Sequence, residues 1–530
     1  MTQPVEIRFT ETATEGLETR TGRIAVIVND KGRLPANLPR ALRAAARRAV
    51  ESEAFGKLKA GQGMSLAYPA GVEAESLQLV KLPPRADALE ARRAGAAIGA
   101  ALGKVETVVM AGNHPRASEI ALGLALRGYD FNAYKTQKSD QAAAETVDTP
   151  AATVSKKGKD ARLADGGAAS DNAGPDGAAP VDPARASVVF MCDAPEEVAR
   201  AAKDSAAVAE GVFFTRDLVS EPANVLTTTD FADRLAAMET LGLEVEVLEE
   251  KDLQKLGMRS LLAVGQGSES PSKVVVMRWN GGKKGDAPFA LVGKGVVFDT
   301  GGISIKPSAG MEEMTMDMGG AAVVAGVMRT LALRRAKANV VGLVGLVENM
   351  PDGRAQRPGD IVRSMKGDTI EVINTDAEGR MVLADVLWYA QETYKPQAVV
   401  DLATLTGACI IALGHDHAGL FSNDDDLAAR LSVSAASEGE GIWRLPLAPA
   451  YDKLIDSRLA DIKNTGGRAA GAITAAQFLQ RFVAEGQAWA HIDIAGVALP
   501  PAATDLAPKG ASGWGVMTLN RMIRDFYEGK

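Results

Sequence analysis

Cysteine is nearly absent from this chain, which has only Cys192 and Cys409 among its 530 residues. Two cysteines cannot form a disulfide framework, and so low a number is typical of a protein from a reducing compartment. Long apolar runs are also missing: no stretch of roughly 18 residues lacks a charge or a turn-forming residue, so we expect no membrane span. Residues 1–6 show no basic segment followed by an apolar one, so we expect no signal peptide and a cytoplasmic location.

Positive charge and histidine are scarce as well. The 59 Lys and Arg residues do not balance the 67 Asp and Glu residues, which leaves a net charge of −8. An acidic chain is a poor general binder of nucleic acid, although a local basic face remains open. The spacing of the four histidines, His114, His415, His417 and His491, matches no usual zinc motif. We expect these histidines to be structural or on the surface rather than metal ligands.

The chain is long enough for two or three domains. Strand and helix patterns alternate up to about residue 135, and a second alternation runs from residue 227 to the end. This pattern predicts an α/β fold with two domains: an N-terminal mixed α/β domain, and a C-terminal α/β domain with a central, mostly parallel sheet flanked by helices. We place the first domain at residues 1–190, a connecting helix at 191–222 and the second domain at 223–530.

The individual elements are predicted from apolar periodicity. The expected strands cover residues 23–28, 106–110, 186–191, 243–248, 273–277, 289–298, 338–346, 398–402 and 489–494. The expected helices cover residues 38–50, 86–102, 196–219, 230–241, 319–333, 381–394 and 472–483.

Residues 136–185 differ from the rest of the chain in composition. Their larger aliphatic side chains are limited to Val147, Val154, Leu163 and Val181, and they include no aromatic residue. Such a segment cannot bury enough apolar surface to offset the entropy that it would lose on ordering. We therefore expect a flexible insertion in the N-terminal domain.

The most informative stretch is a polar turn at residues 374–380, with the sequence Asn-Thr-Asp-Ala-Glu-Gly-Arg. It follows an alternating apolar run at 369–373, which predicts a strand, and open α/β sheets usually bind ligands at the carboxyl ends of their strands. Asp376 and Glu378 are two residues apart, so in extended backbone both carboxylates point to the same side. The turn is therefore either a solvated acidic loop or one side of a metal site.

A second informative region lies at residues 292–306. Lys294 lies inside an apolar strand pattern flanked by glycines, and Asp299 lies where this strand meets a Gly-Gly turn. A buried lysine needs a partner or loses its charge, and a salt bridge to Asp299 is the simplest interpretation. The two residues are five apart, however, which places them on opposite faces of a regular strand. Either Gly295 allows a bulge or Asp299 already belongs to the loop.

Asp317 comes directly before an apolar helix pattern, and its simplest role is the N-cap of that helix. A sharper interpretation places four carboxylates in one site: Asp299, Asp317, Asp376 and Glu378. Two divalent cations would balance their four negative charges, and Lys294 would then be a neutral amine ligand. Lys306 and Arg380 would remain as positive groups facing a substrate. Two metals bridged by carboxylates can activate a water and polarise a carbonyl.

These residues, in this order and spacing, resemble the signature of the leucine aminopeptidase family, the cytosol-type di-metal aminopeptidases. The resemblance is carried by Lys294, Asp299, Lys306, Asp317 and the turn at 374–380. Two further segments, Thr-Leu-Thr-Gly-Ala at 404–408 and Gly-Ala-Ile-Thr-Ala-Ala at 471–476, are similar to the family's substrate-pocket segments. The resemblance covers most of residues 190–530 and covers the first domain only weakly. The insertion at 136–185 departs from the family pattern.

The resemblance implies a leucyl aminopeptidase, a metallo-exopeptidase that releases N-terminal Leu and other apolar residues from peptides. It implies two divalent ions per subunit, Mn²⁺ or Zn²⁺. One ion would be held by Lys294, Asp299, Asp317 and Glu378. The other would be held by Asp299, Asp376 and Glu378, so that Asp299 and Glu378 bridge the two.

The same resemblance implies roles for residues outside the metal ligands. Lys306 would stabilise the oxyanion, and Arg380 would hold a bicarbonate that relays a proton from the attacking water. A charged lysine or arginine is a poor base, which agrees with an outside anion in that role. The substrate pocket would be lined by Met314, Leu405, Gly407 and Ala472. The family is also hexameric, with catalytic domains at the centre, so we expect a homohexamer.

Two other classes of function remain open from the sequence. The chain could be a catalytically inactive relative that binds a ligand or DNA, although the intact carboxylate set and the acidic pI of about 5.4 argue against this. It could instead be a metal-dependent phosphoryl-transfer enzyme, because acidic clusters also hold Mg²⁺. A lysine as a direct ligand disfavours that class, since Mg²⁺ prefers oxygen.

Overall fold

The computed structural model describes residues 2–35, 38–136 and 187–529. Apart from residue 136, the expected flexible insertion at 136–185 falls outside the described residues, so it stays a prediction. Contacts gather Met1–Tyr129 and Arg185–Lys530 into one compact unit and Asp130–Ala184 into a second. The sheets, the helices described below and the candidate site all belong to the first unit.

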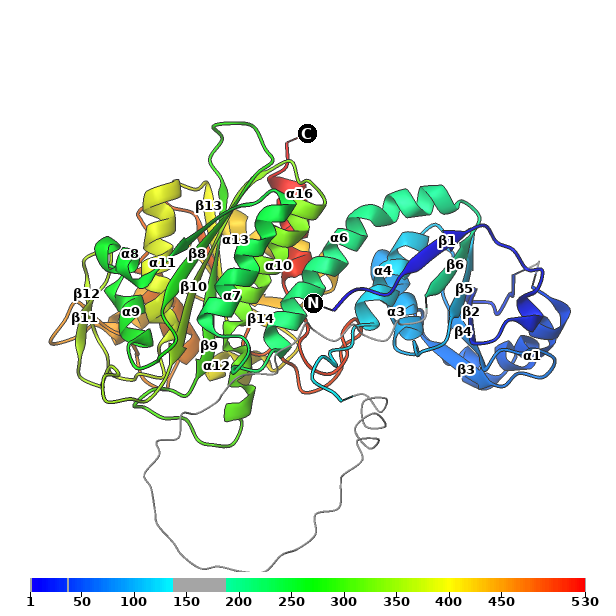
Figure 1. The fold of residues 1–530 in the computed structure, drawn as a ribbon, viewed down its shortest axis with the longest axis horizontal. Helices are drawn as coiled ribbons and strands as arrows, with labels where there is room; N and C mark the ends of the chain where they lie inside the picture. Colours follow the sequence, from blue (N-terminus) through cyan, green and yellow to red (C-terminus); the bar gives the residue numbers. More distant parts are fainter. Residues whose placement is uncertain (1, 36–37, 137–186, 530) are drawn as a thin grey trace, which may run out of the picture. The chain divides into compact units, whose positions relative to one another are not determined.

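A six-stranded sheet organises the N-terminal part of this unit (Figure 1). The strand order is β1 (Ile7–Thr10), β6 (Val188–Cys192), β5 (Thr107–Gly112), β2 (Arg23–Val28), β4 (Ser76–Lys81) and β3 (Gly63–Ala67). Neighbouring strands run parallel except for β3, which pairs antiparallel with β4. The mixed α/β fold expected for this part of the chain is therefore confirmed.

Helices cover both faces of this sheet, because successive side chains of a strand point to opposite sides. The helices are α1 (Arg40–Val50), α2 (Glu53–Gly56), α3 (Ala88–Gly99) and α4 (Ala117–Arg127), with a short 3-10 turn, η1, at Leu17–Thr19. In β2, Ala25 and Ile27 pack into the cluster that contains α3 and α4 residues. Ile24 and Val26 pack into the other cluster, with Leu42 of α1.

A long helix, α6 (Pro195–Ser220), follows the N-terminal sheet and corresponds to the expected connecting helix. Pro195 occupies its first turn, where a missing N–H costs nothing. The helix ends before Pro222, which cannot continue a helical hydrogen-bond pattern. The division of the chain at residues 190 and 222 stays a prediction.

The C-terminal part is built on an eight-stranded sheet (Figure 1). The order is β15 (Ile442–Arg444), β14 (Ala418–Ser422), β17 (Trp489–Asp493), β13 (Ala398–Ala403), β9 (Phe289–Asp299), β10 (Asn339–Asn349), β8 (Lys273–Asn280) and β7 (Glu244–Leu248). The four central strands from β17 to β10 run parallel, as expected. Antiparallel pairs occur on both sides, at β14–β17, β10–β8 and β8–β7.

Helices lie on both faces of the larger sheet as well. They are α7 (Thr228–Ala236), α8 (Glu250–Leu256), α9 (Arg259–Gly265), α10 (Gly319–Leu333), α11 (Gly379–Tyr394), α12 (Gly407–Leu413), α13 (Asp425–Glu438), α14 (Pro449–Asp452), α15 (Gly471–Gln480) and α16 (Val516–Phe526). Short 3-10 turns are η2 (Ala237–Leu241), η3 (Met311–Met318) and η4 (Lys453–Ile455). Leu291 of β9 packs into the core that holds α10, and its neighbour Val292 packs into the core that holds α11.

One described segment, Met311–Leu333, is long and apolar enough to cross a membrane by length and composition, and it comprises η3 and α10. Of its apolar window, 83% is buried inside the protein. Such burial is typical of a core helix, and α10 lies against α6 and the central strands.

A third, three-stranded sheet has the order β11 (Ile361–Arg363), β12 (Thr369–Glu371) and β16 (Ile462–Lys463). β12 is the strand expected at 369–373, but it does not belong to the large sheet. Its pairing with β16 is parallel, Ile370 opposite Ile462 and Glu371 opposite Lys463. The polar turn at 374–380 therefore follows a strand of a small separate sheet rather than a central strand of the large sheet.

Candidate functional site

Lys294 and Asp299 both lie on β9, and a bulge brings their side chains into one region. From Val296 to Asp299 the chain advances three residues, whereas the paired residues of β10, Val347 and Asn349, are two apart. The extra residue in β9 reverses the alternation of faces beyond it. A regular strand would place Lys294 and Asp299 on opposite faces, and this bulge places them on the same face. The bulge follows Val296 rather than forming at Gly295. Asp299 is still the last residue of the strand.

Lys294 is buried and makes three polar contacts. Its Nζ lies 2.7 Å from Oδ1 of Asp317 and 2.8 Å from Oε1 of Glu378, and it donates to the backbone oxygen of Thr404 at 3.0 Å. Burial lowers the pKa of Lys294, but the charges of the neighbouring carboxylates outweigh this and leave the pKa above its usual value. The simple salt bridge between Lys294 and Asp299 is therefore wrong: Lys294 pairs with two other carboxylates.

Asp299 pairs instead with Lys306, whose Nζ lies 2.7 Å from Oδ2. The other oxygen, Oδ1, accepts from the backbone N–H of Gly301 at 2.9 Å and from Nδ2 of Asn349 at 2.8 Å. Burial, followed by the nearby charge of Glu378, raises the pKa of Asp299 to about 6. The carboxylate is thus fixed in orientation but sits close to like charge.

Asp317 lies in η3, one residue before the residue that caps α10. The N-cap of α10 is Met318, and no side chain caps the helix, so the simple N-cap role for Asp317 is wrong. Oδ1 of Asp317 accepts from the hydroxyl of Thr404 at 2.8 Å, while its buried Oδ2 has no hydrogen-bond partner. Burial raises the pKa of Asp317 well above its usual value. A buried carboxylate oxygen without a partner is costly unless something else binds it.

Asp376 and Glu378 reach the same place from the turn that precedes α11. The backbone of Glu378 is helical, with φ −79° and ψ −39°, so the expectation of extended backbone is wrong for this turn. One oxygen from each of Asp376, Glu378 and Asp299 nevertheless lies within 4.8 Å of the others. Lys306 forms an ion pair with Asp376 as well as with Asp299.

The charge balance of this cluster favours cations. Among the described residues, the ion pairs of the four carboxylates Asp299, Asp317, Asp376 and Glu378 involve two ammonium groups, those of Lys294 and Lys306. Two negative charges are left uncompensated when all groups are ionised, and burial raises the cost of each. Oxygen donors with one amine nitrogen suit a divalent metal, and the unpartnered Oδ2 of Asp317 offers a ligand atom. The donor set therefore fits divalent metal binding.

Gly379 shows how closely these groups are packed. A Cβ at this position would lie 2.5 Å from Cε of Lys294, which is too close for any side chain. The absence of a side chain lets the start of α11 approach β9, so that Glu378 can reach the ammonium of Lys294.

Arg380 is the second residue of α11 and is buried. Its Nη1 donates to the backbone oxygen of Asn464 at 2.9 Å, and its Nε is buried without a partner. Burial lowers the pKa of Arg380 to about 10. Among the described residues, no ion pair joins Arg380 to Asp376 or Glu378.

The two segments expected to form a substrate pocket lie side by side. Residues 404–408 run from the end of β13 into α12, and residues 471–476 begin α15. A Cβ at Gly471 would lie 3.0 Å from Cβ of Ala408. Of the predicted pocket residues, Ala472 is buried, Leu405 and Met314 are half-buried, and Gly407 is exposed.

Uncharged residues orient the carboxylates, and these were not predicted from the sequence. Asn349 donates to Asp299 and also to the backbone oxygen of Thr375 at 3.1 Å. Thr404 holds Asp317, and Asn464 contacts the turn that carries Asp376. The one available signal was a polar residue at the end of an apolar strand, as at Asn349. Which polar group such a residue would meet depends on tertiary packing.

Three of the four histidines make contacts with groups other than the four carboxylates of the cluster. A ring nitrogen of His114 lies 3.0 Å from the backbone oxygen of Pro83, and one of His415 lies 2.7 Å from that of Gly496. His491 is fully buried, with Nδ1 2.6 Å from Asp401. His417 is exposed.

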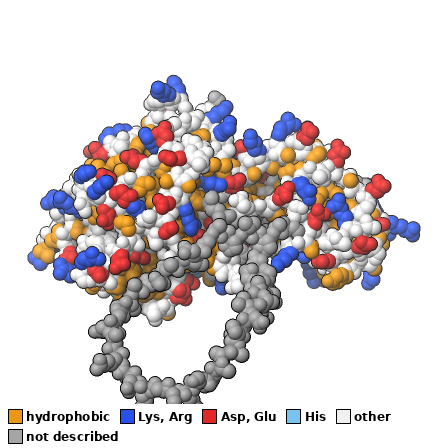
Figure 2. Space-filling view, viewed as in Figure 1, with side chains coloured by type: hydrophobic (Ala, Val, Ile, Leu, Met, Phe, Trp, Pro, Cys, Tyr) orange, Lys and Arg blue, Asp and Glu red, His pale blue; other side chains and the backbone are white. Residues whose placement is uncertain are grey.

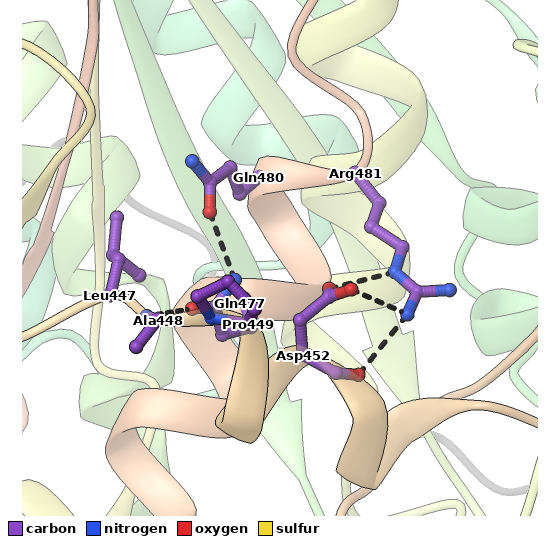
Figure 3. Close-up of a pocket in the computed structure, with 7 residues that line it drawn as sticks. All are labelled: Leu447, Ala448, Pro449, Asp452, Gln477, Gln480 and Arg481. Atoms are coloured by element: carbon purple, nitrogen blue, oxygen red, sulfur yellow. Dashed lines mark hydrogen bonds and ion pairs between the residues drawn. The ribbon is translucent and has the colours of Figure 1, made fainter.

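A hollow of about 380 Å³ lies beside α14 and α15. Figure 3 shows the residues that line it. It is lined by Leu447, Ala448, Pro449, Asp452, Gln477, Gln480 and Arg481, none of them a predicted site residue. Arg481 is engaged there, since its Nε donates to Oδ1 of Asp452 at 2.8 Å. These polar groups join α15 to α14. The carboxylate cluster therefore remains the candidate site.

Comparison with known proteins gives a family for this site. A profile described as the cytosol aminopeptidase family, catalytic domain, matches residues 213–520. The chain belongs to the cytosol aminopeptidase family. Membership in this family makes it a metal-dependent aminopeptidase, a hydrolase that acts on peptides.

Named relatives and solved structures agree with this assignment. The chain is 57% identical to a probable cytosol aminopeptidase of Cereibacter sphaeroides and 59% identical to one of Dinoroseobacter shibae, in both cases over 100% of each chain. Among solved structures it is similar to the bottromycin maturation enzyme BotP in complex with Mn, with 32% identity and a TM-score of 0.76. That match covers 95% of this chain and 98% of BotP.

Proposed function

We propose that this cytosol aminopeptidase releases N-terminal residues, preferentially Leu and other apolar residues, through a water activated between two divalent metal ions. The observation that carries the proposal is the group of four carboxylates, three buried and Asp376 half-buried, whose ion pairs among the described residues involve two lysines. When bound, two such ions polarise the peptide carbonyl and lower the pKa of water.

The proposed ligands are the residues of the cluster. Asp299 and Glu378 would hold both ions, as the family resemblance implies, and their oxygens lie within 4.8 Å of each other and of Asp376. Asp376 completes that group and would bind one ion, and Asp317 and Lys294 would bind the other. Lys294 has a raised pKa, so it binds as a neutral amine only when cations displace its proton.

The metal is proposed to be manganese or zinc. BotP, which is 32% identical to this chain, has been solved in complex with Mn. Zinc also accepts mixed nitrogen and oxygen ligands. Metal analysis of the purified protein identifies which of the two it carries.

Lys306 is proposed to stabilise the oxyanion that forms when the peptide carbonyl is attacked. Burial lowers the pKa of Lys306, but the charges of Asp299 and its neighbours outweigh this and keep the pKa above its usual value. A side chain that stays cationic can compensate developing negative charge. Its side chain is 20% exposed, compared with 3% for Lys294, so it is the more accessible of the two to a substrate.

Arg380 is proposed to hold a bicarbonate ion, which takes the proton from the attacking water. The guanidinium has a buried Nε without a partner, and its planar fork suits a planar anion. Its Nη1 is anchored to Asn464, so it need not move when an anion binds. A guanidinium cannot take the proton itself, because it is already charged at working pH.

The pocket for the first side chain is proposed to be lined by Met314, Leu405, Gly407 and Ala472. These residues are apolar or small, which favours Leu over charged side chains. A Cβ at Gly407 would meet nothing within 4 Å, so the chain leaves open space at this position.

We also propose that the protein is a cytoplasmic homohexamer. Support comes from the names of the relatives, which are cytosol aminopeptidases, and from exposed apolar side chains. Ile305, Ile411 and Trp443 are 63%, 86% and 60% exposed, and contact between subunits would bury such apolar side chains. Light scattering after gel filtration gives the mass of the assembly.

The alternative is an inactive relative that binds a ligand or DNA. The net charge of −8 argues against DNA as the main partner. On the face shown in Figure 2, basic and acidic side chains are interspersed. The decisive experiment compares Leu-p-nitroanilide with its N-acetylated form and with Glu-p-nitroanilide. We expect Leu-p-nitroanilide to be turned over fastest. The N-acetylated form should not be cleaved, since an aminopeptidase needs a free amino group, and the proposed apolar pocket should disfavour Glu-p-nitroanilide. No turnover of any of the three by metal-loaded protein would favour the alternative.

A further inference from the structure

Asn464 extends the small three-stranded sheet at the point where β12 ends. Its backbone N–H donates to the oxygen of Glu371 at 2.9 Å, directly after the pairing of β16 with β12. Its side chain then continues the pairing beyond the strand. Oδ1 accepts from the N–H of Ile373 at 2.8 Å, and Nδ2 donates to the oxygen of Asn374 at 2.7 Å.

The turn held by this side chain is the one that carries Asp376 and Glu378. Nδ2 of Asn464 also lies 3.4 Å from the backbone oxygen of Ala377, between the two carboxylates. On the opposite side the turn is held through Thr375, which bonds to Gly301 and Ser304. Asn464 is therefore one anchor of the turn, together with the bonds of Thr375 and with Asn349, which donates to the backbone oxygen of Thr375. It is fully buried, so water cannot replace the bonds that it makes.

The backbone oxygen of Asn464 holds a second element of the site. It accepts from Nη1 of Arg380 at 2.9 Å, while Nε of Arg380 has no partner. A single buried residue is thus connected both to the turn with two carboxylates and to the guanidinium beside it. Any shift of Asn464 would move both groups together.

We infer that Asn464 is a positioning residue, which sets the metal-binding geometry of Asp376 and Glu378 and the location of Arg380. This inference rests on the proposed function. Groups that orient metal ligands commonly change metal affinity by roughly 10–100-fold when they are removed. Asn464 lies 86 residues from Glu378 along the chain, so only the fold brings it into this role.

The test measures manganese binding by the full-length, metal-depleted protein in equilibrium dialysis. We expect Asn464→Ala to bind manganese roughly 10–100-fold more weakly than the wild type. We also expect kcat to fall while KM for Leu-p-nitroanilide stays within about twofold, because the pocket residues are untouched. Asn464→Ser keeps a polar group in the buried site and so disturbs the fold less. Its manganese affinity is compared with that of the wild type in the same way.

Asn520→Ala is the matched control. Asn520 is also buried and hydrogen-bonded, accepting from Nε of Arg334 at 2.7 Å, but it lies in α16. This variant should lose stability without losing manganese affinity. Equal affinity in wild type and Asn464→Ala would overturn the inference, as would failure of both Asn464 variants to fold. A wild type that binds no manganese and cleaves no substrate would refute the proposed function instead.

Discussion

Single side chains at this site divide into those that would bind metal and those that assist. Asp299, Asp376 and Glu378 place oxygens close together, whereas Arg380 offers only N–H donors. The identity of the charged residues could be predicted from the sequence, because a lysine in an apolar strand and paired carboxylates in a turn are unusual. The partners could not: Lys294 pairs with Asp317 of η3 and with Glu378 before α11, and these contacts arise only from tertiary packing.

Glu378→Ala tests the proposed bridge. Because Glu378 is assigned to both ions, its removal should reduce bound metal from two per chain to less than one and abolish activity. Metal content is measured by plasma mass spectrometry after gel filtration. Asp376→Ala, which removes a ligand of one ion, should also abolish activity but retain more metal. A Glu378→Ala protein with two tightly bound ions would refute the bridge.

Arg380→Ala separates an assisting residue from a ligand. We expect kcat to fall by roughly 10²–10⁴-fold, the usual contribution of proton transfer, with metal content near normal. Adding bicarbonate to carbonate-free buffer should speed the wild type and have little effect on the variant. Arg380→Lys keeps the positive charge but lacks the planar fork, so its turnover should increase only weakly when bicarbonate is added. A wild type indifferent to bicarbonate would exclude the relay.

Among the elements, α11 connects the candidate site to the core. It begins with Gly379 and Arg380 and carries Asp385 one turn further on, fully buried. The carboxylate of Asp385 accepts from the backbone N–H groups of Leu261 and Met365 at 3.0 and 2.8 Å. The helix itself was predictable from its apolar pattern. The start of the helix at Gly379 could not be predicted, because the close approach of this residue to Lys294 is a tertiary contact.

Asp385 makes stability depend on pH. Burial raises the pKa of Asp385 to about 7, from a usual value of 3.8. The folded state therefore favours the protonated form, and the stabilisation is complete below about pH 4 and is lost as the pH rises through about 7. At about 1.4 kcal/mol per unit, the loss is of the order of a few kcal/mol.

The measurement compares Asp385→Asn with the wild type by thermal unfolding between pH 4 and 8. Asparagine stays neutral, so the melting temperature of the variant should increase relative to that of the wild type as the pH rises. A constant difference between the two proteins across this range would show that Asp385 does not titrate as described.

At the scale of the whole molecule, the alternation of strands and helices was sufficient to predict two α/β sheets, the second of them flanked by helices. The edges were harder: the short strands β11, β14, β15 and β16 carry little periodicity, and β12 was predicted as a strand but not as part of a separate sheet. That small sheet matters most for function, because it delivers the turn with Asp376. Its strands are only two or three residues long and are specified by partners distant in sequence.

Deletion of residues 141–180 tests the expectation for the insertion. The segment is poor in aliphatic residues and has no aromatic residue, so its removal should cost little core. We expect the melting temperature, the assembly mass and the turnover of Leu-p-nitroanilide to match those of the full chain. A clear fall in melting temperature would mean that the segment packs against the rest of the protein.

The most direct test of the central claim is a manganese titration of metal-depleted wild-type protein, with activity and bound metal measured in the same samples. Four clustered carboxylates paired with two lysines predict that bound metal saturates at two ions per chain. Turnover of Leu-p-nitroanilide should rise from near zero to its maximum as the sites fill. Full activity in protein shown to be free of metal would contradict the account, and so would saturation without any activity.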